Sequence, residues 1–161
     1  MKIENMAKGR LTESLVEQLF RESGNRIFRF GYEAILQDLT QLERGFDRRT
    51  ETGEQIRSIP DFLVVGKNDS LSFVEVKLRS NLRLKEEDMW VLEKINKYWR
   101  AKIIFVNCIE KPYFRIAIPP YFENGALKLE PLIGQNEWYV NKDLYKECED
   151  LIERFIFRKK K

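Results

Sequence analysis

The chain has 161 residues, 43% of them hydrophobic, which is enough for one domain with a hydrophobic core. Its 29 basic and 26 acidic residues leave a net charge that is too small to indicate a nucleic-acid binder by itself. The absence of histidine excludes imidazole as a general base or zinc ligand, and Cys108 and Cys148 form no Cys-x-x-Cys pair. No run approaches transmembrane length and no secretory stretch opens the chain, so we expect a cytoplasmic protein that does not enter the membrane.

The N-terminal part predicts a helix, a strand and an ambiguous segment. Apolar residues recur at helical spacing over residues 9–23, and Gly24 is a typical stop after a helix. Residues 26–32 alternate enough to form the first strand. Residues 34–42 fit a short helix or a strand, and we expect residues 43–57, with two glycines and four arginines, to form a mobile loop.

Residues 59–78 predict an antiparallel hairpin, because two runs rich in β-branched and aromatic residues enclose a polar turn at 66–70. If the turn is centred on Asn68, Asp61 and Glu75 face each other, and directly opposed Cβ atoms lie roughly 4.5–5.5 Å apart. Lys77 projects to the same side as Glu75, because side chains alternate along a strand. Two carboxylates and one ammonium are therefore expected to converge.

The rest of the chain predicts a helix, two strands and a closing segment. Acidic residues at 86–88 favour a helix start, and strands are expected over 102–107 and 113–118. Asn141 or Asp143 could cap a final helix. The inner stripe of the middle helix is predicted to comprise Met89, Leu92, Ile95 and Trp99.

The converging charges indicate a metal site. Two carboxylates held together raise one pKa or require a cation, and Mg²⁺ or Mn²⁺ accepts one or two carboxylates together with waters and substrate phosphate. Asp61 and Glu75 would hold the ion, and Lys77 would position or polarise a water, an arrangement that suits phosphodiester hydrolysis. The alternative is that Glu75 and Lys77 are only an exposed pair on a strand face.

These residues resemble the signature of the PD-(D/E)xK nuclease superfamily, which is present here as Pro60-Asp61 followed by Glu75-Val76-Lys77. The signature is short, and its weight comes from the two strands that carry it. The resemblance implies a catalytic set that includes Asp61, Glu75 and Lys77, with the Val76 carbonyl as a further metal ligand.

A second match lies in the predicted N-terminal helix. Lys8-Gly9 is followed by Glu13, four residues past the glycine, and archaeal Holliday-junction resolvases look similar at this point. The resemblance implies that Glu13 completes the catalytic and metal-binding set, with Glu17, one helical turn further on, as the alternative.

The resemblance also implies an α/β fold: a restriction-endonuclease-like core with a mixed central β-sheet flanked by helices in the order α-β-β-β-α-β. The core would span about 8–118 and a C-terminal β/α extension about 119–161, in one nuclease-like domain over 1–161. A homodimer is implied too, because resolvases cut two strands symmetrically. Residues 34–58 replace a short basic loop of those resolvases, and the serine they carry after the first strand is missing here.

Basic residues gather in groups, two of which flank the predicted site, where they would hold a phosphate backbone. The first group precedes the first predicted helix, the second precedes the hairpin, the third follows Lys77, and Arg29 adds a cation in the first strand. The groups are Lys8 and Arg10; Arg44, Arg48, Arg49 and Arg57; and Arg79, Arg83 and Lys85.

The sequence therefore predicts a divalent-metal-dependent endonuclease that hydrolyses DNA, with branched DNA as the favoured substrate. Two alternatives remain: a non-catalytic nucleic-acid-binding or assembly subunit on the same fold, and a restriction-type or repair-type nuclease acting on linear DNA.

Overall fold

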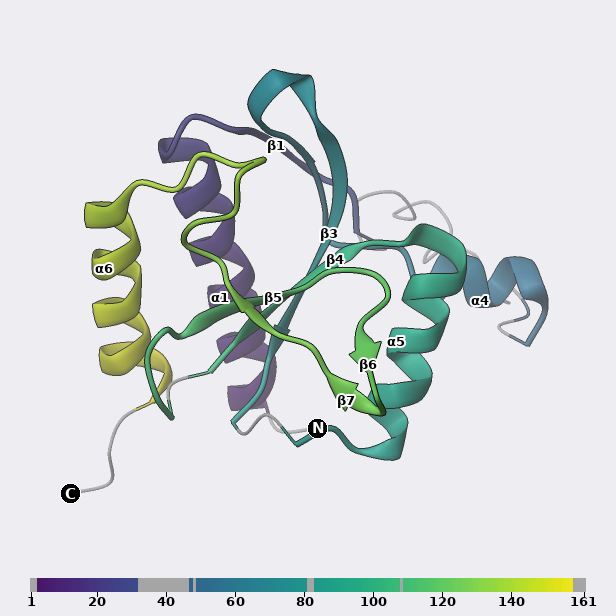
Figure 1. Ribbon diagram of the computed structural model, residues 1–161. Helices are drawn as coiled ribbons and strands as arrows, with labels where there is room; N and C mark the ends of the chain where they lie inside the picture. The colour runs from purple at the N-terminus through teal and green to yellow at the C-terminus, as the bar shows by residue number, and fades with distance from the viewer. Residues whose placement is uncertain (1–2, 32–46, 48, 81–82, 108, 158–161) are drawn as a thin grey trace.

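The computed structural model describes residues 3–31, 47, 49–80, 83–107 and 109–157. A 3-10 turn, Lys67–Asp69, joins β2 to β3, and a π-helical turn, Ile152–Ile156, follows α6. The elements, shown in Figure 1, are α1 (Ile3–Glu22), β1 (Arg26–Arg29), α4 (Glu51–Arg57), β2 (Phe62–Val65), β3 (Leu71–Leu78), α5 (Glu86–Trp99), β4 (Lys102–Val106), β5 (Phe114–Ala117), β6 (Phe122–Glu123), β7 (Ala126–Leu127), β8 (Glu130–Pro131) and α6 (Lys142–Leu151).

Most of the strands belong to one mixed sheet with the order β1-β2-β3-β4-β5-β8. Neighbouring strands are antiparallel except for β3 and β4, which are parallel. A parallel pair needs a crossover, and α5 supplies it. The predicted α/β fold class, a mixed central sheet flanked by helices, is confirmed.

The helices cover the two faces of this sheet, with α1 and α6 on one side and α5 on the other (Figure 1). The burial pattern of β4 shows both layers: Ile104 and Val106 pack in the cluster that contains α1, while Ile103 and Phe105 pack in the cluster that contains α5. The prediction that this strand is covered on both faces is confirmed.

Helix α1 starts earlier than expected, so the prediction that Lys8 precedes the helix is wrong. Gly9 lies inside the helix, where one glycine costs roughly 1 kcal/mol and does not terminate it. Contacts on both sides of Gly9 support the helix: Lys8 pairs with Glu4 at 2.7 Å, and the Thr12 hydroxyl donates to the Lys8 carbonyl at 2.7 Å.

The C-terminal end of α1 was predicted correctly. Gly24 has φ of +105°, a conformation that glycine adopts without a Cβ penalty. Its N–H donates to the Arg21 carbonyl and the N–H of Asn25 donates to the Phe20 carbonyl, both at 3.1 Å, which is the hydrogen-bond pattern of a Schellman motif. The turn sends the chain directly into β1, which is shorter than the predicted strand over 26–32.

The prediction of a mobile loop over residues 43–57 is wrong for its second half, because α4 forms there. Thr50 caps the helix by accepting a hydrogen bond from the Gly53 N–H at 3.0 Å. The helix docks on α5 through an ion pair between Lys94 and Glu54 at 2.8 Å. The helix has seven residues and a single large apolar side chain, which is too little to show a helical period in the sequence. Its formation therefore depends on tertiary contacts. The predictions for residues 34–42 and for Arg44 and Arg48 concern positions outside the described residues.

Helix α5 buries Leu92 and Ile95 against the sheet, as expected. Met89 is 40% exposed, so its assignment to the inner stripe is wrong. The first turn is oriented instead by Asp88, whose carboxylate meets Arg79 at 2.5 Å.

The C-terminal segment belongs to the same core. β8 pairs with β5, and the buried Trp138 contacts Phe20 of α1 edge to face with ring centroids 4.9 Å apart. Asn141 rather than Asp143 caps α6, accepting hydrogen bonds from two N–H groups of its first turn. Among the described residues, no helix combines the length and apolarity that crossing a bilayer requires.

Candidate active site

The hairpin register brings Asp61 and Glu75 to opposite positions. Phe62 pairs with Val74 and Val65 pairs with Leu71 across β2 and β3. Continuing the same register by one residue sets Asp61 against Glu75, with Asn68 at the centre of the turn in a left-handed conformation (φ 54°, ψ 33°). The predicted register is confirmed.

Asp61 is fixed from both neighbouring strands. Its carbonyl accepts hydrogen bonds from the N–H groups of Phe30 at 2.8 Å and Gly31 at 3.1 Å, just past β1. Its carboxylate oxygen Oδ2 accepts the N–H of Val76 in β3 at 2.8 Å. The backbone of Asp61 therefore continues the sheet pairing with the segment after β1, and its side-chain carboxylate lies next to the backbone of β3.

Glu75 and Lys77 form an ion pair on β3, with Lys77 Nζ donating to Glu75 Oε1. The side chains are only 10% and 19% exposed, respectively, so solvent screens the pair weakly. This burial distinguishes the pair from the exposed strand-face pair that the sequence left as an alternative.

Electrostatics set Asp61 apart from an ordinary carboxylate. Burial raises the pKa of the Asp61 carboxyl well above its usual range, and the charges of Glu75 and Glu13 raise it further; the Val76 N–H and the Lys77 ammonium oppose the shift without cancelling it. Burial lowers the pKa of Lys77, but Glu75 and Asp61 raise it more, so that Lys77 stays an ammonium at neutral pH.

We expect Asp61→Asn to raise the melting temperature of the metal-free protein at neutral pH. An aspartate whose pKa is raised by folding costs stability as the pH rises from its unfolded pKa through its folded one, and a neutral amide avoids that cost while still accepting the Val76 N–H. Melting curves in EDTA should show a gain of several degrees at about pH 7 that disappears at about pH 3, where aspartate is protonated in both states.

The control for that experiment is Asp69→Asn, on the same hairpin but with a side chain that is 88% exposed, which should change the melting temperature little. An Asp61→Asn protein that melts at or below the parent at neutral pH would contradict the electrostatic description of the site.

Of the two candidate helix acids, Glu13 acts electrostatically on Asp61, whereas Glu17 is engaged with other partners. Glu17 is buried and pairs with Arg21 at 2.8 Å and with Arg29 at 2.5 Å. Glu13, one turn earlier, acts on the pKa of Asp61. Arg29, predicted to contact nucleic acid, is thus engaged with a buried carboxylate.

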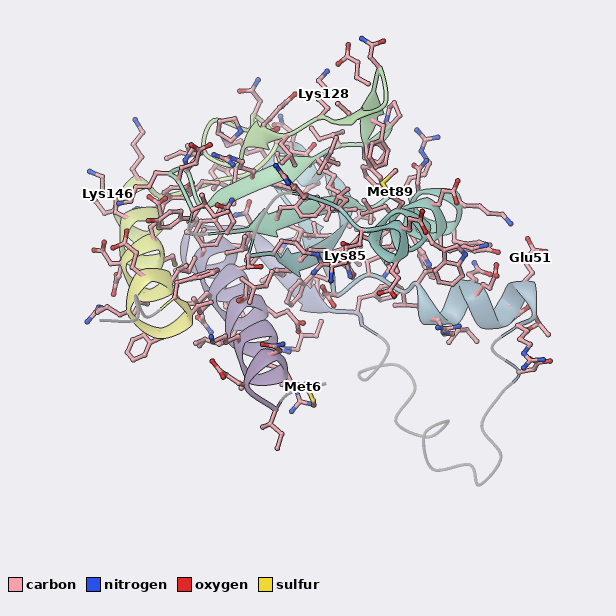
Figure 2. The ribbon with its side chains drawn as sticks, turned by 90° about the horizontal axis from the view of Figure 1, so that it is seen from below. Met6, Glu51, Lys85, Met89, Lys128 and Lys146 are labelled. Atoms are coloured by element: carbon pink, nitrogen blue, oxygen red, sulfur yellow. The ribbon has the colours of Figure 1, made fainter. Side chains whose placement is uncertain are left out.

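A cleft of about 700 Å³ opens beside Val76 and Lys77 between the first turns of α1 and α5. Two of the predicted basic groups meet here although they are far apart in sequence, and Lys85 lies near the middle of the view in Figure 2. Arg10 and Arg57 do not line this cleft. The basic residues that do are Lys8, Lys77, Arg79, Arg83 and Lys85.

Arg79 also orders one wall of the cleft. Its guanidinium donates to the Leu78 carbonyl at 2.8 Å and pairs with Asp88, whose own N-cap interaction with the Lys85 N–H fixes the start of α5. Burial acts to raise the pKa of Asp88, but the Lys85 N–H and Arg79 outweigh it, so the pKa is lowered and Asp88 stays charged.

Sequence reasoning missed several lining residues, among them Asn5 and Phe157. Asn5 lines the cleft because α1 begins at Ile3, and Phe157 lines it because the end of the chain after α6 returns to this edge. The position of Asn5 could have been predicted from the helix-forming residues that precede Gly9. No sequence pattern indicates that Phe157 lies at the cleft.

The donors present suit a hard divalent cation. In the part of the chain that the structure describes, no three acidic or cysteine side chains are close enough to form a metal-binding group. Mg²⁺ often uses only one or two carboxylates, with waters and phosphate completing its shell. The raised pKa of Asp61 indicates a site that favours either a proton or a cation.

No protein-family model matches the chain, and no curated protein matches it. Among solved structures, the chain is similar to a Holliday junction resolvase of the archaeal hyperthermophile Archaeoglobus fulgidus, with 14% identity over 91% of this chain and 98% of that chain and a TM-score of 0.39. This match assigns no family to the chain, and function is inferred from the residues of the site.

Proposed function

We propose that the protein is a divalent-metal-dependent nuclease that hydrolyses phosphodiester bonds of DNA. The observation that carries the proposal is the meeting of Asp61, Glu75 and Lys77, of which Lys77 also lines a basic cleft. A binding module gains nothing from two acids at this position, because a half-buried carboxylate pair costs stability and repels phosphate.

Each residue has a role in this proposal. Asp61 and Glu75 would hold Mg²⁺ or Mn²⁺ together with the Val76 carbonyl, and Glu13 would have to move closer to join them as a third acidic ligand. The bound ion would supply a water of lowered pKa and neutralise charge on the phosphate. Lys77, which is charged at neutral pH, orients Glu75 and donates a hydrogen bond to the attacking water rather than accepting its proton.

The basic lining residues would hold the phosphate backbone so that one phosphate lies next to Lys77. Charge-assisted contacts of this kind make binding depend on salt. Branched DNA is the favoured substrate and a homodimer the favoured assembly in this proposal, following the resemblance at Lys8, Gly9 and Glu13. The cytoplasm is the favoured location, as expected from the sequence.

The proposal is tested by incubating the protein with linear duplex, single-stranded, flapped and four-way DNA in Mg²⁺, in Mn²⁺ and in EDTA. Cleavage is expected with either metal and not in EDTA. Selective cutting of four-way DNA would support a resolvase-type activity, and cutting of linear duplex would support a restriction-type or repair-type one. Intact DNA in every mixture, with binding retained, would replace the nuclease by a binding subunit.

A further inference from the structure

Trp90 of α5 carries a partly exposed indole ring that has two cations close to it. It is 45% exposed, with the Arg57 guanidinium 5.9 Å from its ring centroid and the Lys94 ammonium 5.3 Å from it. We call these three residues the Trp90 platform. The core packing of α5 is carried by Leu92 and Ile95, so the position of Trp90 is not explained by burial.

The Trp90 platform rests on two helices that hold each other in place. Lys94 pairs with Glu54 at 2.8 Å, and the Tyr98 hydroxyl donates to the same carboxylate at 3.2 Å. The indole N–H of Trp99 lies 3.2 Å from both the Gln55 carbonyl and the Ser58 hydroxyl. These contacts fix Arg57 and Trp90 relative to each other before any ligand arrives, which lowers the ordering cost of binding.

The Trp90 platform lies next to the basic cleft. Glu87 lines the cleft, and Trp90 follows it by three residues, which makes the two side chains neighbours on the helix surface. From Arg57 the chain runs directly to Asp61.

An exposed indole face flanked by cations is suited to one kind of ligand. Nucleobases stack on aromatic rings with little dependence on sequence, and neighbouring cations hold the adjoining phosphates. Paired bases within a duplex have both faces covered by their neighbours, so away from the duplex ends only an unpaired nucleotide presents a free face. Arg57, together with Lys94, which also pairs with Glu54, would repel a cationic partner and attract the phosphates of a nucleic acid.

We propose that Trp90 stacks on an unpaired base of the DNA strand whose backbone lies in the cleft, so that the preferred substrates carry unpaired nucleotides beside the cut. This inference rests on the proposed function, because it takes the DNA bound in the cleft as its starting point. It also gives Arg57, which does not line the cleft, a place in substrate binding.

The test measures binding of oligo-dT and of a blunt duplex in EDTA, where no cleavage occurs, for the parent, Trp90→Ala and Trp90→Phe. Trp90→Ala should weaken binding of oligo-dT by about tenfold and leave duplex binding unchanged, while Trp90→Phe should retain most of the affinity because a ring remains. Oligo-dT should quench the tryptophan fluorescence of the parent, and most of that quenching should be lost in both variants. Met89→Ala, a change at a neighbouring residue that is 40% exposed, serves as the matched control and should bind as the parent does.

Equal oligo-dT affinity in the parent and Trp90→Ala would overturn the inference, and so would an equal loss of oligo-dT and duplex binding. If the parent binds duplex but not oligo-dT, the inference fails while the proposed nuclease stands. If the parent binds neither DNA, both fail. Melting curves for each variant separate loss of the ring from loss of α4 docking.

Discussion

Replacing Lys77 by alanine is expected to lower the rate of DNA cleavage by about 10²–10³-fold while DNA binding changes little. The Lys77 ammonium contacts Glu75 and acts on the charge of Asp61, and removing one preorganised donor of this kind from a catalytic site typically costs that much in rate. Binding is retained because several other cations line the cleft. Single-turnover cleavage and filter binding of the same DNA measure the two effects separately.

Lys102→Ala is the matched control for this experiment. Lys102 also pairs with a glutamate, Glu137, and its side chain is 18% exposed, close to the 19% of Lys77. Losing a half-buried ion pair should cost the two variants similar stability, but only Lys77→Ala should lose cleavage. Equal cleavage by Lys77→Ala and the parent would move the active site elsewhere, and equal loss in both variants would mean that stability explains the effect.

The largest expected effect on stability is that of Gly66→Ala, at the end of β2. A Cβ at this position would collide with the Glu137 carbonyl oxygen and lie 2.7 Å from Trp138 Cδ1. The Glu137 carbonyl also accepts the Lys67 N–H at 2.7 Å, so it cannot move without breaking that hydrogen bond. We expect a loss of about 1–3 kcal/mol, and a fall in melting temperature of about 2–4 °C for each kcal/mol, in thermal melts.

Gly9→Ala serves as a comparison, because it should raise the stability of the protein where Gly66→Ala lowers it. Nothing lies within 4 Å of a Cβ at Gly9, and the residue is inside α1, so alanine should stabilise the protein by about 0.4–1 kcal/mol. If Gly66→Ala has the same melting temperature as the parent, the close approach of the turn to residues 137–138 is not what holds the hairpin in register.

The candidate site could be predicted from the sequence as far as it depends on local periodicity. The separation of Asp61 and Glu75 around Asn68 determined the register, because one turn joins two strands of period two. The alternation of β3 set Glu75 and Lys77 on one side and Val74 and Val76 on the other, in the core shared with α1. The assignment of Glu13 as a metal ligand stays a prediction.

Features that depend on tertiary contacts could not be predicted in this way. Helix α4 is stabilised by Glu54 and Gln55 meeting α5, residues about forty positions further along the chain. The cleft likewise joins Lys8 of α1 to Arg83 and Lys85, which no local pattern connects. Trp90 was overlooked because a single exposed aromatic residue breaks no periodicity.

The contact between the β2–β3 turn and residues 137–139 bears on how the protein matures. Ser70, Ser72 and Lys67 all hydrogen-bond to Glu137, so the ribbon that carries the acids is anchored by a segment translated long after it. We therefore expect the ribbon to gain this anchor only after the late segment has been translated. A nascent chain would then lack the fully anchored candidate site until most of its synthesis is complete.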